Sequence, residues 1–147
     1  MRVEARRELL APPEDVWEIV AEPYHLSDWW PGYAGVEPDR LGLAEGARWR
    51  ILRGSTRAAT SDLLRRPGGE TTAVIRRVID GRVLSWHDTA LQVDAQVTLA
   101  PAAQRHTEVV VEIEGGWARI VFEGLRSVPA QAVRRLFDLC QTAAETQ

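Results

Sequence analysis

The C-terminal part of the chain carries its longest helical pattern, and this pattern constrains the fold most. Between Trp117 and Ala144 apolar residues recur at spacings of three and four, which places them on one face of a helix. This stripe consists of Val121, Leu125, Val128, Ala132, Leu136, Cys140 and Ala143. Pro129 predicts a kink in this helix or its division in two, because proline removes one backbone hydrogen bond and clashes with the preceding turn. Such a long stripe must be buried, and the sequence offers only strands as a large partner.

Alternating apolar and polar residues predict these strands over most of the remaining chain. Asp80-Gly81 is a favoured pair for a tight hairpin turn. The segment 55–69 has two interpretations: it extends the preceding strand, or it forms a loop over a cavity mouth. The predicted strands are Arg2–Leu10, Tyr33–Asp39, Ala47–Arg53, Glu70–Ile79, Arg82–Thr89, Leu91–Leu99 and Thr107–Glu114.

Two short helices are expected between the first two strands. One opens at Ala11–Asp15, where prolines suit the first turn and acidic residues complement the helix dipole. The other spans Tyr24–Trp30. The order of elements predicts an α+β fold, in which a curved antiparallel sheet of about six to seven strands wraps around the long C-terminal helix. The short helices would close one end.

Length and composition limit the classes of protein to consider. At 147 residues we expect a single domain over 1–147 with its own core. The single Cys140 excludes an internal disulfide and fits a reducing compartment, so we expect a cytoplasmic protein. No apolar run approaches the length of a membrane span or forms a signal peptide. The net charge of −3 argues against nucleic-acid binding, and the use of arginine for all 18 basic residues is typical of a high-GC bacterial genome.

Four segments resemble one known family. The segment Ala11–Trp17 (APPEDVW) is followed by Asp28-Trp29-Trp30-Pro31, by Gly46–Leu52 (GARWRIL) and by a strand that ends in Ser85-Trp86-His87. Together they resemble the START/SRPBCC superfamily, in its bacterial branch of polyketide cyclases and dehydrases. The resemblance covers nearly the whole chain and implies the helix-grip fold, with a cavity between sheet and C-terminal helix.

The resemblance implies that this cavity takes a small hydrophobic ligand, such as a polyketide, lipid or isoprenoid, without a cofactor or metal. An alternative is a polyketide cyclase, aromatase or dehydratase. In such enzymes the pocket carries tryptophan, tyrosine and arginine, and Trp30 and Tyr33 match the first two by motif position. Arg53, Arg57 and Arg65 all lie in the region of the arginine. A third hypothesis is a protein-interaction module without a ligand, and a homodimer stays open.

The six tryptophans suggest flat walls for a polycyclic ligand, although aromatic residues also fill cores. We expect Trp17 in the core, and for Trp49 and Trp117 the two roles are evenly balanced. The candidate catalytic residues are Tyr33, Arg53 and His87. The candidate ligand-binding residues are Trp30, Tyr33, Trp49, Ile51, Arg53, Trp86, Trp117, Val121 and Leu125.

The histidines offer little further chemistry. His87 and Asp88 are adjacent on a strand and point to opposite faces, and Ser85 lies roughly 6.6–6.8 Å from His87 along it, so a Ser-His-Asp hydrolase is not expected. His87 is open between a pocket acid or base and a structurally bonded residue. His25 and Asp28, one helical turn apart, are expected to form a surface pair without further metal ligands.

Two arginine positions and the cysteine complete the sequence-based expectations. Arg7 falls on the inward face of the first strand. One of Arg76 and Arg77 must also face inward unless the strand bulges there. Cys140 lies on the buried stripe of the long helix, where we expect a small core residue.

Overall fold

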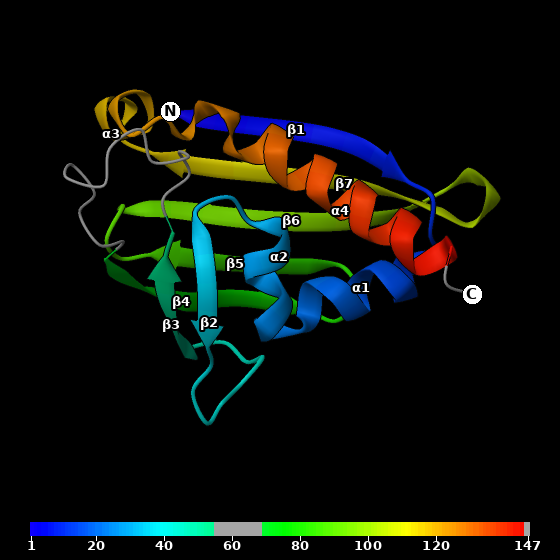
Figure 1. Ribbon diagram of the computed structural model, residues 1–147, viewed down its shortest axis with the longest axis horizontal. Coiled ribbons are helices and arrows are strands. Elements are labelled where there is room, and N and C mark those ends of the chain that lie inside the picture. The colour runs from blue at the N-terminus through cyan, green and yellow to red at the C-terminus, as the bar shows by residue number, and fades with distance from the viewer. Residues whose placement is uncertain (55–68, 146–147) are drawn as a thin grey trace.

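The computed structural model describes residues 1–54 and 69–145, in which seven strands form one antiparallel sheet of order β1-β7-β6-β5-β4-β3-β2 (Figure 1). The expectations for Arg57, Arg65 and nearly all of the segment 55–69 lie outside the described residues. The strands are β1 (Arg2–Leu9), β2 (Tyr33–Glu37), β3 (Arg48–Arg53), β4 (Glu70–Ile79), β5 (Val83–Asp88), β6 (Val93–Ala102) and β7 (His106–Gly115). The helices are α1 (Pro13–Ala21), α2 (Leu26–Trp29), α3 (Trp117–Phe122) and α4 (Val128–Glu145).

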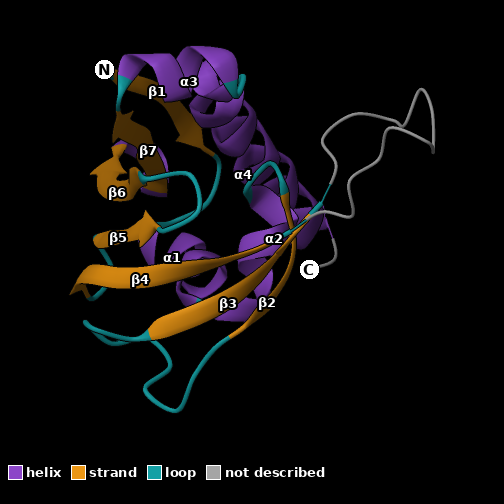
Figure 2. Ribbon diagram, turned by 90° about the vertical axis from the view of Figure 1, so that its left-hand side faces the viewer, coloured by secondary structure: helices purple, strands orange, loops and turns teal. Residues whose placement is uncertain are grey.

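The sheet is curved, and its inner face wraps around the helices (Figure 2). Burial alternates along the strands as the sequence predicts, with Val93, Ala95, Val97 and Leu99 of β6 all buried. The turn at Asp80-Gly81 closes the β4–β5 hairpin, and Gly81 adopts a φ of 74° that suits glycine. The predicted helix-grip architecture is therefore confirmed, because one sheet and one long helix share a single core.

The predicted C-terminal helix is divided, as Pro129 suggested, but the break lies earlier in the chain. Gly124 has a left-handed φ of 69°, and a 3₁₀ turn at Leu125–Ser127 separates α3 from α4. Pro129 occupies the first turn of α4, where its missing N–H needs no acceptor. The apolar stripe is consequently buried only in α4, where it comprises Val128, Ala132, Leu136 and Cys140.

The structure shows where the side chains of Arg7, Arg76 and Arg77 lie. A register shift between Ile75 and Arg77 marks a bulge in β4, and both Arg76 and Arg77 are exposed. On β1, the guanidinium carbon of Arg7 lies 4.0 Å from the ring centroid of Phe137 in α4. Arg7 thus lies toward the helix, with its charge over an aromatic ring.

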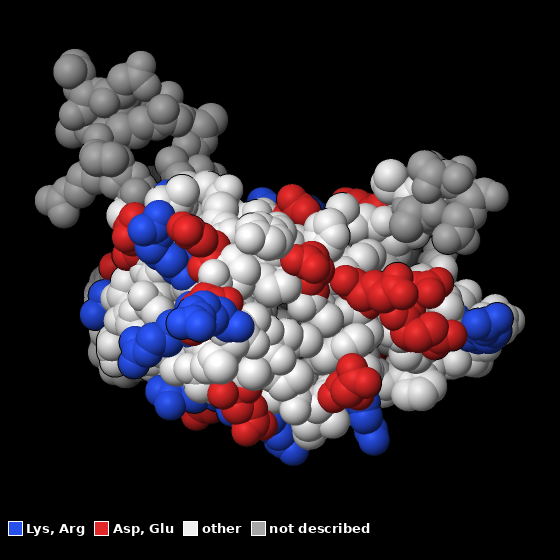
Figure 3. Space-filling view, turned by 90° about the horizontal axis from the view of Figure 1, so that it is seen from below, with Lys and Arg blue, Asp and Glu red and all other residues white. Residues whose placement is uncertain are grey.

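Cys140 is buried in α4, and its surroundings raise the pKa of the thiol to about 11, because burial disfavours the thiolate and Asp15 adds to that effect. It is a core residue, as predicted. No helix within residues 1–54 and 69–145 has the length and apolar character needed to cross a bilayer. On the face seen from below, groups of acidic and basic side chains both occur, with uncharged side chains between them (Figure 3).

The packing of α4 against the sheet predicts a large cost for truncating its buried face. Leu136→Ala should lower the free energy of unfolding by about 2–5 kcal/mol, because a fully buried leucine leaves a cavity when shortened. Exposed Arg134, on the same helix, provides the control, and Arg134→Ala should change the free energy by no more than about 0.5 kcal/mol. Urea unfolding followed by circular dichroism measures both, and equal effects would contradict this packing.

Candidate functional site

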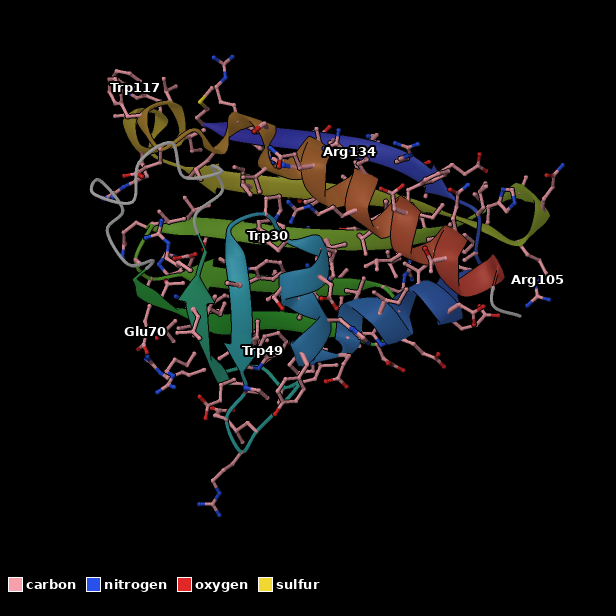
Figure 4. The ribbon with its side chains drawn as sticks, in the orientation of Figure 1. Trp30, Trp49, Glu70, Arg105, Trp117 and Arg134 are labelled. Atoms are coloured by element: carbon pink, nitrogen blue, oxygen red, sulfur yellow. The ribbon has the colours of Figure 1, made fainter. Side chains whose placement is uncertain are left out.

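A cavity of about 320 Å³ lies between the inner face of the sheet and the chain that leads into α4. The α2–β2 connection contributes Trp30, Pro31, Gly32 and Tyr33, and Figure 4 shows Trp30 near the middle of the molecule. The other lining residues are Arg53, Gly54, Asp88, Leu91, Val93, Ala95, Ile113, Glu123, Gly124, Leu125, Ser127, Val128 and Gln131. The walls combine apolar side chains with charged, amide and hydroxyl groups in about equal measure.

Three tryptophans pack together beside the cavity. The ring centroids of Trp30 and Trp86 lie 4.8 Å apart at an interplanar angle of 73°. Trp29 lies 5.7 Å from Trp30 and 6.2 Å from Trp86, and both of these pairs are also edge-to-face. Edge-to-face contacts stabilise such clusters beyond the burial of area alone. Trp30 therefore lines the cavity from a fixed position, supported by two buried rings.

A buried carboxylate, Asp88 at the end of β5, lines the same cavity with only 2% of its surface exposed. Its Oδ2 accepts a hydrogen bond of 2.6 Å from the Tyr33 hydroxyl. Its Oδ1 accepts bonds of 2.6 Å from Thr71 Oγ1 and 3.0 Å from the Leu91 backbone N–H. Such bonds offset the free-energy cost of removing a carboxylate from water. They also tie β2, β4 and the β5–β6 turn to one side chain.

Tyr33 is the second buried polar residue of the cavity. Besides donating to Asp88, its hydroxyl oxygen accepts a 3.3 Å hydrogen bond from the indole N–H of Trp86. Burial raises the pKa of Tyr33 well above its ordinary value, and the adjacent Asp88 carboxylate raises it further, against smaller opposing effects of Trp86 and Arg53. The phenol therefore remains neutral and keeps its hydrogen directed at Asp88.

Among the residues that the structure describes, two charged residues line the cavity in addition to Asp88. Arg53 ends β3, directly opposite Tyr33 in the β2–β3 register, and is partly buried. Glu123 lies at the break between α3 and α4, where its carboxylate is 3.8 Å from Arg119. The cavity thus combines apolar walls with groups that could orient a polar substituent.

The structure brings together four of the predicted ligand-binding residues, namely Trp30, Tyr33, Arg53 and Leu125. Three others, Trp49, Ile51 and Trp86, are fully buried but do not line this cavity. Trp49 donates its indole N–H to the Gly42 carbonyl at 2.8 Å, and Trp86 stands behind Trp30. These side chains pack in the core and do not contribute to the cavity wall.

Trp117 and Val121 lie outside the cavity, contrary to the expectation from helical periodicity. Trp117 is 66% exposed at the outer end of the molecule, and Val121 is 38% exposed (Figure 4). The turn at Gly124 redirects α3, so the stripe does not continue along a single helix axis. Trp117 contacts Phe122 instead, with ring centroids 6.3 Å apart.

The histidines lie away from the cavity. His87 does not line it; its Nδ1 lies 2.8 Å from Asp94 Oδ1 in an exposed pair, which fits the structurally bonded alternative rather than the pocket acid or base. His25 and Asp28 form the predicted surface pair at 3.0 Å. In the described ranges 1–54 and 69–145, no three His, Cys, Asp or Glu side chains cluster in a way that could hold a metal.

Asp88 and Thr71 were not among the candidate site residues, although one signal for Asp88 was present in the sequence. Leu84 and Trp86 alternate with polar residues along β5, and this alternation places Asp88 on the same inward face. A charged residue at an inward position of a strand marks either a strand end or a buried site. Thr71 carries no comparable signal, because threonine is common in strands.

A curved antiparallel sheet closed over a C-terminal helix, with a lined cavity between them, defines the helix-grip class of proteins. A family model described as "Polyketide cyclase / dehydrase and lipid transport" matches residues 1–145. The chain belongs to this family, which confirms the resemblance drawn from its motifs. A search of curated proteins found no match.

Solved structures share the fold at low sequence identity. Protein NE0264 from Nitrosomonas europaea superposes with a TM-score of 0.73 at 18% identity, and the match covers 99% of this chain and 97% of that one. Protein CV1439 from Chromobacterium violaceum superposes with a TM-score of 0.70 at 19% identity, covering 95% of this chain and 96% of that one. DynU16, a putative protein in the dynemicin biosynthetic locus, superposes with a TM-score of 0.65 at 20% identity, and the match covers 97% of this chain but only 48% of that one.

The environment of Tyr33 predicts its behaviour in alkali. Only two tyrosines occur, so in a Tyr24→Phe variant all tyrosinate absorbance comes from Tyr33. Because its pKa is raised in the folded state, stability is intact below the unfolded value of about 10 and falls as the pH rises above it. We expect tyrosinate to appear only together with unfolding.

A pH titration by ultraviolet absorbance, with circular dichroism as the measure of folding, checks this expectation. Tyr33→Phe supplies the comparison, since its remaining tyrosine, Tyr24, is 62% exposed. Ionisation of Tyr33 near pH 10 in a protein that is still folded would show that the buried contact with Asp88 does not persist in solution.

Proposed function

We propose that the protein binds a small hydrophobic molecule of the polyketide, lipid or isoprenoid kind in the cavity between the sheet and α4. The observation that carries this proposal is the cavity itself, because its volume of about 320 Å³ falls in the range of small-molecule sites. Val93, Ala95, Ile113 and Val128 supply an apolar wall, and polar side chains line the rest of the cavity.

Burial of apolar ligand surface against these walls would supply most of the affinity, at roughly 25 cal/mol per Å² removed from water before the costs of association. Trp30 offers an aromatic surface held in place by Trp29 and Trp86. The polar groups of Tyr33, Asp88 and Arg53 would set the orientation. The family description joins polyketide enzymes with lipid transport, and both ligand classes combine apolar surface with polar groups, as the cavity lining does.

Filling the cavity should weaken this binding. Leu125 is partly buried and lines the cavity, so Leu125→Trp should weaken the affinity for a naphthalene-based ligand by at least about tenfold, or 1.4 kcal/mol. Val121→Trp introduces the same side chain at an exposed position outside the cavity and should leave affinity unchanged. Isothermal titration calorimetry measures both. Equal affinities in the two variants would place the ligand elsewhere.

An enzymatic role is the second candidate, favoured by the convergence of Tyr33, Asp88 and Arg53 on one cavity. A cyclase, aromatase or dehydratase would fold a polyketide chain there and use such groups to move protons at its carbonyls. Incubation with a poly-β-ketone thioester separates the two functions. Turnover that is lost in Tyr33→Phe and Arg53→Ala would identify an enzyme, and retention of the unchanged substrate would identify a carrier.

An interaction module is the third candidate, and it rests on the exposed aromatic pair of α3. Phe122 is 79% exposed beside Trp117. Exposed apolar surface of this kind marks contact sites when it forms a large patch. A homodimer formed through α3 would be seen by size-exclusion chromatography and lost in a Trp117→Ala and Phe122→Ala double variant.

A further inference from the structure

Asp88, Tyr33, Thr71 and Trp86 form a polar cluster in which every donor hydrogen is already engaged in a hydrogen bond. The single hydroxyl hydrogen of Tyr33 goes to Asp88 Oδ2, and that of Thr71 goes to Oδ1. The Leu91 backbone N–H also donates to Oδ1, and the indole N–H of Trp86 donates to Tyr33 Oη. Each of these groups has one hydrogen to give. None of the four hydrogens is left for a ligand.

The same count leaves unused acceptor capacity on the two residues that line the cavity. A phenolic oxygen has two lone pairs, and Trp86 uses one of those on Tyr33. A carboxylate accepts about four hydrogen bonds, and Asp88 receives three from residues 1–54 and 69–145, of which only the one from Tyr33 reaches Oδ2. Asp88 Oδ2 and Tyr33 Oη therefore each have room for one more donor.

The direction of the Tyr33–Asp88 hydrogen bond is fixed. Burial next to a carboxylate raises the pKa of Tyr33, so the phenol keeps its hydrogen, and that hydrogen has a strong acceptor 2.6 Å away. Turning it toward a ligand would break a bond to a buried carboxylate. A ligand carbonyl or ether oxygen placed here would thus face lone pairs only.

Two kinds of ligand group can donate to such acceptors: a hydroxyl and an ammonium. The described wall carries the carboxylates of Asp88 and Glu123 as well as the guanidinium of Arg53, so its charges do not select between the two groups. Desolvation does, because a neutral hydroxyl leaves water at a much smaller free-energy cost than a cation. The smaller desolvation cost therefore favours the hydroxyl.

Building on the proposed function, we propose that the cavity selects hydroxyl-bearing hydrophobic ligands, such as phenols, whose hydroxyl group donates a hydrogen bond to Asp88 beside Tyr33. The ring system lies along the apolar wall, and the hydroxyl is the group by which the ligand is oriented. Ligands of the same shape that can only accept a hydrogen bond bind more weakly.

A matched pair of ligands tests this selectivity. β-Naphthol and β-naphthyl methyl ether share a ring system, but only the former can donate. Calorimetry on the native protein should show β-naphthol binding at least about tenfold more tightly, the size of effect expected for a hydrogen bond to a charged group. Equal affinities would overturn the inference while leaving the proposed function intact. If neither ligand binds, both the inference and the proposed function fail for this ligand class.

Asp88→Asn tests the acceptor directly. The amide can donate to Tyr33 Oη, which frees the tyrosine hydrogen for the ligand, so the preference for β-naphthol should vanish or reverse toward the ether. Asp94→Asn is the matched control, because it removes a carboxylate from the exposed pair with His87 outside the cavity, and should keep the native preference. An unchanged preference in Asp88→Asn would overturn the proposal.

A second variant covers the case in which Asp88→Asn does not fold. Tyr33→Phe removes the phenolic oxygen and leaves Asp88 Oδ2 as an acceptor, so the preference for β-naphthol over the ether should persist at about tenfold or more. Loss of the preference in this variant would show that Asp88 is not the acceptor. Near-ultraviolet circular dichroism confirms folding in each case.

Discussion

The buried carboxylate of Asp88 is the interaction on which the cavity depends. In the described part of the chain, it accepts hydrogen bonds from β2, β4 and the β5–β6 turn, so one side chain fixes elements that are separate in the sequence. An unpartnered carboxylate in this position would be strongly destabilising. The partners are therefore held to a narrow geometry, and that geometry places Tyr33 at the cavity wall and Trp86 behind Trp30. The same bonds that stabilise the fold at this point also determine which hydrogen-bonding groups a ligand meets.

Most of the fold could be predicted from the sequence because it rests on local periodicities. Alternating burial on β6 and the tight turn at Asp80-Gly81 follow from patterns within a few residues. The break at Gly124 could not be predicted in this way, since Val121 and Leu125 keep helical spacing across it and a single glycine is tolerated in helices. The left-handed turn at Gly124 separates α3 from α4. This is why Trp117 was expected at the cavity and is found in solvent.

The candidate site was predictable only in part, for a related reason. Motif position pointed to Trp30 and Tyr33, and both line the cavity. The bond between Tyr33 and Asp88 joins residues 55 positions apart, and the one from Thr71 spans 17, so no local pattern contains them. Alternation along β5 did place Asp88 on the inward face, but a carboxylate there becomes informative only once its partners are known. For His87 too, the sequence did not reveal the partner, because Asp94 lies on the neighbouring strand β6.

The pairing of β1 with β7 has a consequence for how the chain folds as it is made. Arg2 lies opposite Glu114 and Leu9 opposite Thr107, so β1 can pair only after about a hundred further residues have been synthesised. At ribosomal rates of about 5–20 residues per second, this delay lasts roughly 5–20 s. Throughout that interval β1 has neither its neighbouring strand nor α4 to cover it. The strand carries Arg2, Glu4, Arg6 and Glu8 in alternation, a charge pattern that disfavours pairing of this unpaired edge with other nascent chains.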